Sequence, residues 1–326
     1  MERALRVVLR VVSLGLAAAN AGADTLTVIT YNVGLLKAFG FDLVPLVDAR
    51  AKAAPREISR LAADARPDIM LLEEIWDDGI AGAIVKELAP QGYAGVKPDT
   101  RSVIGLTSGL LLLTKSPLRV EDWKFTPFGR TTFIDSFARK GVLEATIMNT
   151  ETGARFALLG THTEALETSN GVPKVRGQLS VFLAQADQIL AALRSRSGSG
   201  SMPALLLGDM NAGPGCADAA YRKIVDAGSL VEAGAVLFPF TPLVTWDPGN
   251  PLVKRGSYPE EPAAKIDHVF LRDGACARWR VLGARTVMTS PMEGLELAPS
   301  KGVAGVPVPL SDHYGFLCEL ELIAAP

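Results

Sequence analysis

Apolar residues gather in short runs along this chain, and these runs predict a structure rich in strands. Residues 26–31 alternate in polarity and are rich in β-branched side chains, as is typical of a strand. Four further runs are apolar throughout, which favours strands buried on both faces; they are residues 69–72, 110–113, 156–159 and 204–207. The last two strands are predicted at residues 266–271 and 316–322.

Helical spacing of apolar and charged residues is confined to two segments, residues 48–65 and 175–194. Segments rich in Gly, Ser or Pro predict loops, the first of them flexible; they are residues 194–201, 238–264 and 286–310. No change of composition divides residues 24–326. The pattern therefore predicts one domain over residues 24–326, with a mixed-sheet core covered on both faces.

The first 23 residues have a different pattern. Two arginines precede an apolar stretch at residues 7–19, and the small residues Ala21-Gly22-Ala23 come just before Asp24. This order is typical of a secretory signal peptide. The alternative is a membrane anchor, but the stretch is shorter than the roughly 20 residues that a spanning helix needs, and Arg10 interrupts it. We expect cleavage near Ala23 and a secreted or periplasmic protein.

Composition sets broad limits on function. The chain has 326 residues, of which 48% are hydrophobic and 21% charged, enough for a buried core. The net charge is −2 and no basic run is present, which disfavours a large nucleic-acid-binding face. The cysteines Cys216, Cys276 and Cys318 form no Cys-x-x-Cys pair, so a zinc knuckle is not expected. One disulfide with a leftover thiol and three free thiols are both compatible with the sequence.

The candidate chemistry lies at the ends of the predicted strands. Six apolar segments end in carboxylates, amides or imidazoles; they are residues 29–32, 71–74, 159–162, 206–211, 266–268 and 310–313. One polar residue after a strand is usually a turn former. Six such ends, which together use all three histidines of the chain, instead predict a site at one edge of a sheet.

The order of these motifs resembles the endonuclease/exonuclease/phosphatase superfamily. The matching motifs are Tyr31-Asn32-Val33, Leu72-Glu73-Glu74, Gly160-Thr161-His162, Gly208-Asp209-Met210-Asn211, Asp267-His268 and Ser311-Asp312-His313. The resemblance extends over residues 26–320. It implies an α/β fold, a four-layer α/β/β/α sandwich with two mixed β-sheets packed face to face. It also implies a Mg²⁺ site at one edge, which Mn²⁺ could occupy as a substitute.

The resemblance places the metal ligands. Mg²⁺ prefers oxygen ligands and is held by one or two carboxylates together with waters and substrate phosphate. By position, Glu74 supplies the carboxylate and Asn32 a neutral oxygen. Asp312 is a further candidate ligand, with a turn-capping role as the alternative. The metal would stabilise charge on the phosphoryl group and on the leaving oxygen.

The remaining matched residues take catalytic roles. His313 is the candidate general base, because the pKa of imidazole lies near working pH. Asp267 would orient the ring, as the acid of a triad does, and Asp209 would align the attacking water. Asn211 and His162 would donate hydrogen bonds to the non-bridging phosphate oxygens.

Two positions depart from the family pattern. Glu73 replaces the usual glutamine, and an extra acid there could raise the pKa of Glu74 or join the metal site. His268 replaces the usual tyrosine or phenylalanine, so no family role passes to it and we interpret it as structural.

Other stretches resemble the neutral sphingomyelinase branch of that superfamily; they are residues 32–36, 48–52, 108–110, 140–143 and 245–252. They imply a phospholipid substrate at a membrane surface. The apolar segment 39–47 could contact lipid if exposed, although packing over the core is favoured. Trp246 and Tyr314 are candidate contacts for a choline head group, with packing as the alternative.

Three rivals stay open. A secreted nuclease would need several cations, which this chain could supply from Arg130, Arg139, Lys140, Lys174 and Arg176. A phosphoinositide phosphatase is the second rival. A non-catalytic binding module would have lost part of the polar set, yet the set is complete. Nucleic acid is the less favoured substrate, and no obligate protein partner is evident.

Overall fold

The computed structural model describes residues 24–38, 40–102, 105–132, 135–165, 168–169, 172–173, 177–255, 261–299 and 305–325. The predicted signal peptide, residues 1–23, and Phe39 of the apolar segment lie outside the described residues. Among the described residues, no helix is long and apolar enough to cross a membrane.

Twelve strands form two mixed sheets of six. The first sheet has the order β15-β18-β1-β4-β6-β5, and the second has the order β13-β14-β12-β9-β8-β7. The strands of the first sheet are β1 (Asp24–Asn32), β4 (Ile69–Glu73), β5 (Tyr93–Val96), β6 (Leu111–Lys115), β15 (Ala277–Val287) and β18 (Gly315–Ala324). Those of the second are β7 (Leu118–Pro127), β8 (Gly141–Asn149), β9 (Arg155–His162), β12 (Ala204–Asp209), β13 (Val231–Glu232) and β14 (Asp267–Arg272).

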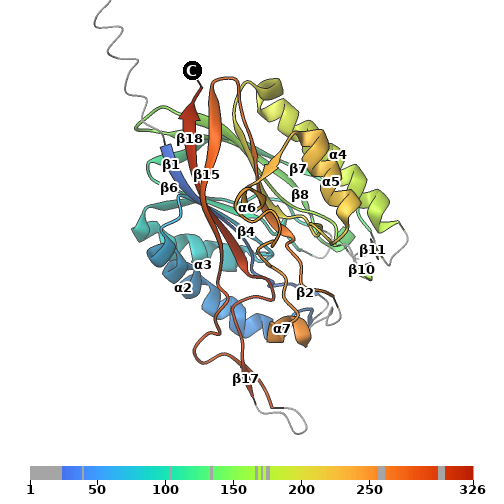
Figure 1. The fold of residues 1–326 in the computed structure, drawn as a ribbon. Helices are drawn as coiled ribbons and strands as arrows, with labels where there is room; N and C mark the ends of the chain where they lie inside the picture. The colour runs from blue at the N-terminus through green and yellow to red at the C-terminus, as the bar shows by residue number, and fades with distance from the viewer. Residues whose placement is uncertain are drawn as a thin grey trace, which may run out of the picture.

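The two sheets pack face to face with helices outside, as Figure 1 shows. Helices α2 (Val47–Ala65) and α3 (Asp78–Leu88) cover the first sheet, while α4 (Gln178–Arg196) and α5 (Asp218–Gly228) cover the second. β4 explains why such strands are apolar throughout: Met70 packs toward the helices, and Leu71 packs between the sheets. The predicted four-layer α/β/β/α sandwich is confirmed.

Shorter elements decorate the sandwich; they are β2 (Lys37–Ala38), β3 (Phe41–Asp42), β10 (Thr168–Ser169), β11 (Val172–Pro173), β16 (Glu296–Leu297), β17 (Val306–Pro307), α6 (Ala233–Leu237), α7 (Pro251–Lys254) and the 3₁₀ turns η1 (Ala89–Gln91), η2 (Asp135–Phe137) and η3 (Gly198–Gly200). The predicted loop over residues 194–201 is wrong at its start, because α4 continues to Arg196. The prediction that residues 286–310 are mostly loop holds for the described residues, although β15 extends to Val287. Leu193 and Val287 are buried, and this packing keeps the chain regular further than its composition suggests.

The structure answers two questions that the sequence left open, the disulfide state of the cysteines and the exposure of the apolar segment after β1. No disulfide joins Cys216, Cys276 or Cys318, all of which are described residues. Within the segment, Leu46 packs against the core and Val47 is buried, whereas the Phe41 side chain is 74% exposed on the hairpin formed by β2 and β3. The segment therefore divides into a packed part and an exposed aromatic tip.

Candidate active site

Strand register brings the polar strand ends together. β1 and β4 are parallel, with Asn32 opposite Glu73. β9 and β12 are also parallel, with His162 opposite Asp209, and Asp209 faces Asp267 across the antiparallel β12–β14 pair. The central parallel pairs of both sheets thus end at one edge of the sandwich. Residues far apart in the sequence become neighbours there.

A glycine lets two of these strands approach closely. Gly208 has a φ of 142°, and a Cβ atom there would lie 1.8 Å from the Thr161 carbonyl oxygen. No other residue fits at this position without moving the backbone. Gly208 therefore sets the spacing between β9 and β12 just before they deliver His162 and Asp209.

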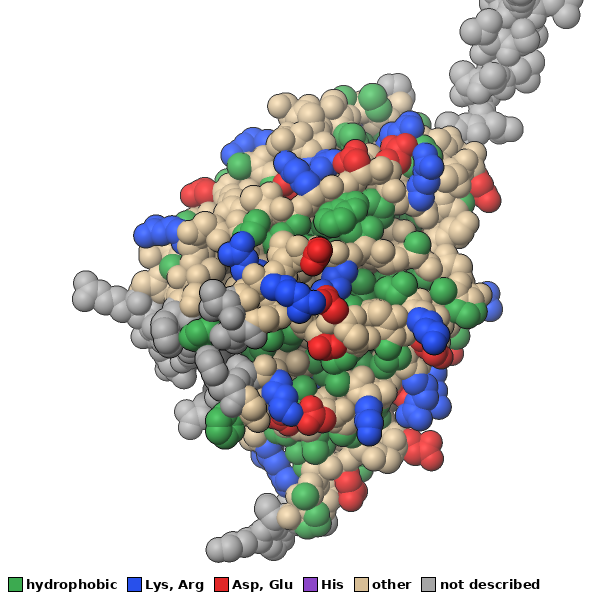
Figure 2. Space-filling model, turned by 180° about the vertical axis from the view of Figure 1, so that it is seen from behind, with side chains coloured by type: hydrophobic (Ala, Val, Ile, Leu, Met, Phe, Trp, Pro, Cys, Tyr) green, Lys and Arg blue, Asp and Glu red, His purple; other side chains and the backbone are tan. Residues whose placement is uncertain are grey.

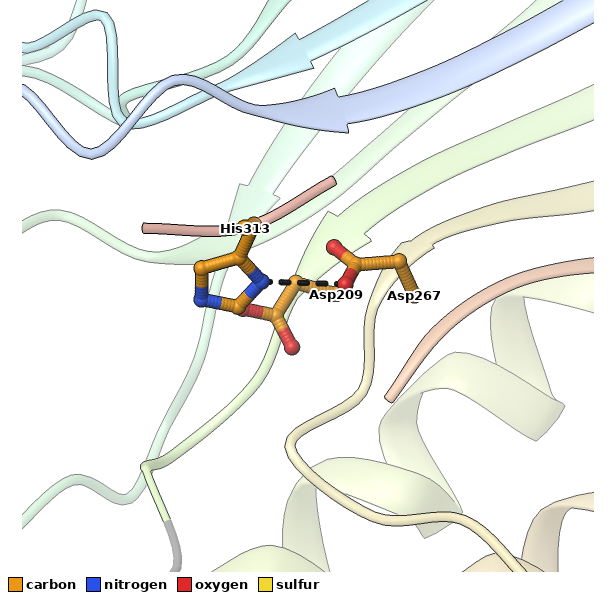
Figure 3. A group of neighbouring side chains, drawn as sticks. All are labelled: Asp209, Asp267 and His313. Atoms are coloured by element: carbon orange, nitrogen blue, oxygen red, sulfur yellow. Dashed lines mark hydrogen bonds and ion pairs between the residues drawn. The ribbon is translucent and has the colours of Figure 1, made fainter. Parts of the chain in front are cut away.

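His313, Asp267 and Asp209 form the centre of the site (Figure 3). The His313 Nδ1 atom donates to Asp267 Oδ2 over 2.9 Å, and its Nε2 atom lies 3.8 Å from Asp209 Oδ2. Burial lowers the pKa of His313, but the Asp267 and Asp209 carboxylates outweigh it and hold that pKa well above its usual value. The ring is fixed by one carboxylate while its other nitrogen faces a second.

Asp209 links this centre to the strand end of the first sheet. Its carboxylate accepts from Asn32 Nδ2 over 3.0 Å and from the Asn211 backbone N–H over 2.8 Å. Burial and the charge of Asp267 raise the pKa of Asp209 to about 7. The Asn211 side chain donates to the Thr163 carbonyl oxygen over 3.3 Å, beside the site.

Glu74 and Asp312 form a second acidic group. Glu74 has a φ of 59°, and its Oε1 atom accepts from Asn32 Nδ2 over 3.2 Å. Burial first and Asp312 second raise the pKa of Glu74. The turn before His313 is capped by Ser311, whose Oγ accepts the His313 N–H over 3.2 Å. The Ser311 hydroxyl also donates to Asp312 Oδ1 over 3.1 Å, so the metal-ligand role and the turn-capping role of Asp312 both stay predictions.

The extra acid Glu73 is placed differently from the expectation. Its Oε1 atom accepts from Thr30 Oγ1 over 2.6 Å on the neighbouring strand, and its side chain is fully buried. Asp312, rather than Glu73, is the acid that raises the pKa of Glu74. β4 ends at Glu73, and the left-handed φ of 59° at Glu74 turns the chain there, which explains the separation.

The donor set fits a divalent cation. Ligand atoms of Asp209, Asp267 and His313 lie within 4.8 Å of one another, and buried Asp267 Oδ1 has no hydrogen-bond partner in the described part of the chain. Glu74 and Asp312 add two further carboxylates, and burial first and the charge of Asp312 second raise the pKa of Glu74. Hard oxygen ligands with surplus negative charge are the set that Mg²⁺ prefers.

The buried cation Lys140 reaches the site, although the sequence had given it no catalytic role and had suggested it as a possible contact for nucleic acid. The Lys140 ammonium group donates to Asp135 Oδ2, the Thr163 carbonyl oxygen and His162 Nε2, at 3.0, 3.0 and 3.2 Å. Burial, Lys140 and His313 keep the pKa of His162 well below its usual value. Because an ammonium group can only donate, the neutral His162 ring carries its proton on Nδ1, which has no partner among the described residues.

The remaining predicted residues lie at the margins. Trp246 is only 8% exposed, and its ring meets His313 edge-on at 5.0 Å between centroids. Tyr314, which follows His313 in the sequence, is half-buried. Their contact with substrate stays a prediction. His268 is fully buried on the other face of β14, where its Nε2 atom lies 2.9 Å from the Ala212 carbonyl oxygen.

The chain is similar to a known protein family over most of its length. Residues 29–313 match the model of the endonuclease/exonuclease/phosphatase family. Curated protein sequences contain no match.

Among solved structures, sphingomyelinase C from Streptomyces griseocarneus is similar, with a TM-score of 0.67 and 21% identity over 91% of this chain and 99% of that one. A mutant of beta toxin from Staphylococcus aureus with bound magnesium ions gives 0.67 and 14% over 93% and 100%. TDP2 from D. rerio with a single-strand DNA product gives 0.62 and 16% over 91% and 99%. At these identities the likeness establishes the fold.

Proposed function

This chain belongs to the endonuclease/exonuclease/phosphatase family, whose members are hydrolases of phosphodiester bonds, and from that premise we propose an exported, Mg²⁺-dependent phosphodiesterase that cleaves sphingomyelin. The observation that carries the proposal is the convergence of His313, Asp267 and Asp209 beside the acids Glu74 and Asp312. The expected products are ceramide and phosphocholine.

The metal would be held by Glu74, Asn32 and Asp312. When bound there, Mg²⁺ supplies positive charge that offsets the carboxylates and the charge of the substrate phosphate. Mn²⁺ is the expected substitute. Asn32 suits this position, because its amide donates to both Glu74 and Asp209 and so ties the acidic group to the catalytic centre.

The chain's own residues would activate the water. His313 would act as the base in its neutral form, taking a proton from water at Nε2 while Asp267 holds Nδ1 and stabilises the ring once it is charged. Asp209 faces the same Nε2 atom and aligns the water. Asn211 and His162 would donate to the non-bridging phosphate oxygens, and the buried charge of Lys140 beside His162 adds to their effect.

The choice of sphingomyelin rests on several supports. The stretches at residues 32–36 and 245–252 resemble the sphingomyelinase branch. The exposed Phe41 tip follows the Asn32 strand end and suits contact with a lipid interface. On the face in Figure 2, acidic and basic side chains are interspersed, and no basic stripe suits a long nucleic acid. Trp246 and Tyr314 are proposed near the choline group.

Export is part of the proposal. The first strand begins at Asp24, directly after the small residues that suit signal-peptide cleavage. Removal of residues 1–23 would therefore leave β1 complete, and residues 24–326 would form the single catalytic domain. Mass spectrometry of protein from its native host should find a mature N-terminus near Asp24. A chain that retains Met1 in the cytoplasm contradicts this part of the proposal.

A parallel assay tests the substrate. Protein without residues 1–23 is incubated with Mg²⁺ and, separately, sphingomyelin vesicles, phosphatidylcholine vesicles, phosphoinositide vesicles and plasmid DNA. We expect release of phosphocholine from sphingomyelin to be fastest. Rapid nicking of DNA with intact sphingomyelin would establish the nuclease rival instead, and release of inorganic phosphate from the phosphoinositide would establish the phosphatase.

A further inference from the structure

A short segment between the catalytic elements contacts both members of the His313–Asp267 pair. The linking segment, residues 245–250, lies between α6 and α7. Thr245 and Asn250 are buried in it although both side chains are polar. Buried polar side chains are normally retained for the hydrogen bonds they make, so the partners of these two residues indicate what the segment does.

Thr245 contacts the backbone on both sides of the pair. Its hydroxyl oxygen accepts the Ile266 and Asp267 backbone N–H groups over 3.1 and 3.2 Å. Its carbonyl oxygen accepts the Tyr314 N–H over 2.7 Å. One residue therefore fixes the start of β14, which carries Asp267, relative to the residue that follows His313.

Trp246 continues this connection. Its backbone pairs with Ala264 through hydrogen bonds of 2.9 Å in both directions and forms an isolated β-bridge with His313. Its indole ring meets the His313 ring at an interplanar angle of 67°. Rotation of the imidazole would bring it against this ring.

Asn250 holds the backbone just before His313. Its Nδ2 atom donates to the Ser311 and Asp312 carbonyl oxygens over 2.9 and 3.0 Å. Its Oδ1 atom accepts the Leu252 N–H over 3.0 Å and so caps α7. The same amide therefore anchors a helix start and the segment that carries the base.

We infer that Thr245 and Asn250 are positioning residues, which hold the His313 ring and the Asp267 carboxylate in register for proton transfer. This inference rests on the proposed function. Neither side chain contacts the reacting groups; they act through the backbone on either side of them. Catalysis is sensitive to displacements well below the size of an atom, so this support should appear in kcat.

Thr245→Val and Thr245→Ser test the inference as a matched pair. Valine keeps the shape but removes the oxygen that accepts two N–H groups, whereas serine keeps that oxygen. We expect Thr245→Val to lower kcat about 10- to 100-fold, with KM within about twofold of wild type. Thr245→Ser should recover most of the loss.

Thr146→Val is the control for simple destabilisation. Thr146 is buried on β8, and its hydroxyl oxygen accepts from Arg196 Nη1 over 3.1 Å. It pairs with Ala157, five residues before the His162 strand end. The control should lose stability but keep kcat, measured well below its Tm. Equal losses of kcat in Thr146→Val and Thr245→Val overturn the inference.

Asn250→Asp provides a second variant in case Thr245→Val does not fold. Aspartate retains the helix cap, because its oxygen still accepts the Leu252 N–H, but it cannot donate to the Ser311 and Asp312 carbonyl oxygens. A normal kcat in this variant would overturn the role of Asn250.

A spectroscopic readout separates failure of the inference from failure of the proposed function. The His313 Nδ1 proton, hydrogen-bonded to Asp267, should give a downfield resonance in wild type. It should shift or vanish in Thr245→Val and return in Thr245→Ser. If wild type cleaves no phosphodiester, the proposed function fails, and this resonance still decides the positioning role. An unchanged resonance in Thr245→Val contradicts it.

Discussion

Two buried polar clusters lie on opposite faces of β14 and differ in how their charges are balanced. Asp267 faces the catalytic cluster with Asp209 and His313. His268, the next residue, faces a second cluster with Glu232 and Lys265. In the second cluster Lys265 Nζ lies 3.2 Å from Glu232 Oε1. The acids of the catalytic cluster and its neighbours outnumber their cations.

The pKa values of the acids in the two clusters reflect this difference in charge balance. Burial raises the pKa of Glu232, but the charge of Lys265 and the contacts of the Glu232 carboxylate with His268 and the Ala235 N–H together outweigh burial and lower that pKa to about 2. For Asp209, burial and a like charge act together and raise the pKa to about 7. A buried cluster whose charges are paired serves structure. One with surplus acid reaches balance by binding a proton or a metal cation, and this marks it as a candidate functional site.

The largest expected effect separates the histidines of the two clusters. His313→Ala should lower kcat by about 10²–10⁴-fold, because general-base catalysis is lost. His268→Ala should leave kcat near wild type while costing stability, roughly 3 kcal/mol for a buried ring and its hydrogen bond. Steady-state kinetics and denaturant unfolding measure the two effects. If His268→Ala were inactive and His313→Ala active, the cluster of His268 would be the catalytic one and the account would be wrong.

Glu232→Gln tests the paired cluster. Removing one partner of a buried ion pair should cost roughly 3–5 kcal/mol at neutral pH, since Lys265 is left unbalanced. The folded pKa of Glu232 is depressed from 4.5 to about 2, so the stability it contributes is present above pH 4.5 and is lost as pH falls through about 2.

The pH dependence of unfolding checks this assignment. Between pH 4.5 and 2, the free energy of unfolding of wild type should fall more steeply than that of Glu232→Gln. Parallel curves over that range would mean that Glu232 is not paired as described.

In the absence of metal, Glu74→Gln should raise the free energy of unfolding, whereas Glu232→Gln should lower it. It removes one of two neighbouring acids, so the protein without Mg²⁺ should gain a little stability. Activity at a fixed Mg²⁺ concentration should fall at least about tenfold. Mg²⁺ should raise the Tm of wild type but not that of the variant. An equal Mg²⁺-dependent rise in both proteins would remove Glu74 from the metal site.

The sequence predicted most of the central strands, because those strands are apolar on both faces. It missed β5, β8 and β13, although β8 is buried along nearly its whole length. It also missed β7 and β15, whose outward faces are polar and whose register shifts at Val120/Asp122 and Val281/Gly283. Such irregular edge strands lack the simple alternation that a pattern can detect. The helices α3 and α5 were also missed.

The sequence predicted the site residues that stand in motifs at strand ends. It gave no site role to residues that reach the site only through the pairing of strands. Lys140 precedes His162 by 22 residues, and only the β8–β9 pairing, with Val142 opposite Thr161, brings it to the site. The contacts of Thr245 with Asp267 and Tyr314 depend in the same way on the folded chain. The sequence around each of these residues gives no sign of contacts with residues far away in the chain.

The most direct test of the account follows the oxygen of the attacking water. Protein freed of metal is given sphingomyelin vesicles in water enriched in ¹⁸O, with and without Mg²⁺, and the released phosphocholine is examined by ³¹P NMR. The account predicts one ¹⁸O atom on phosphorus, with product formed only when Mg²⁺ is present. Phosphocholine without ¹⁸O, or product formed at the same rate in chelated protein, would contradict metal-assisted attack by water at phosphorus.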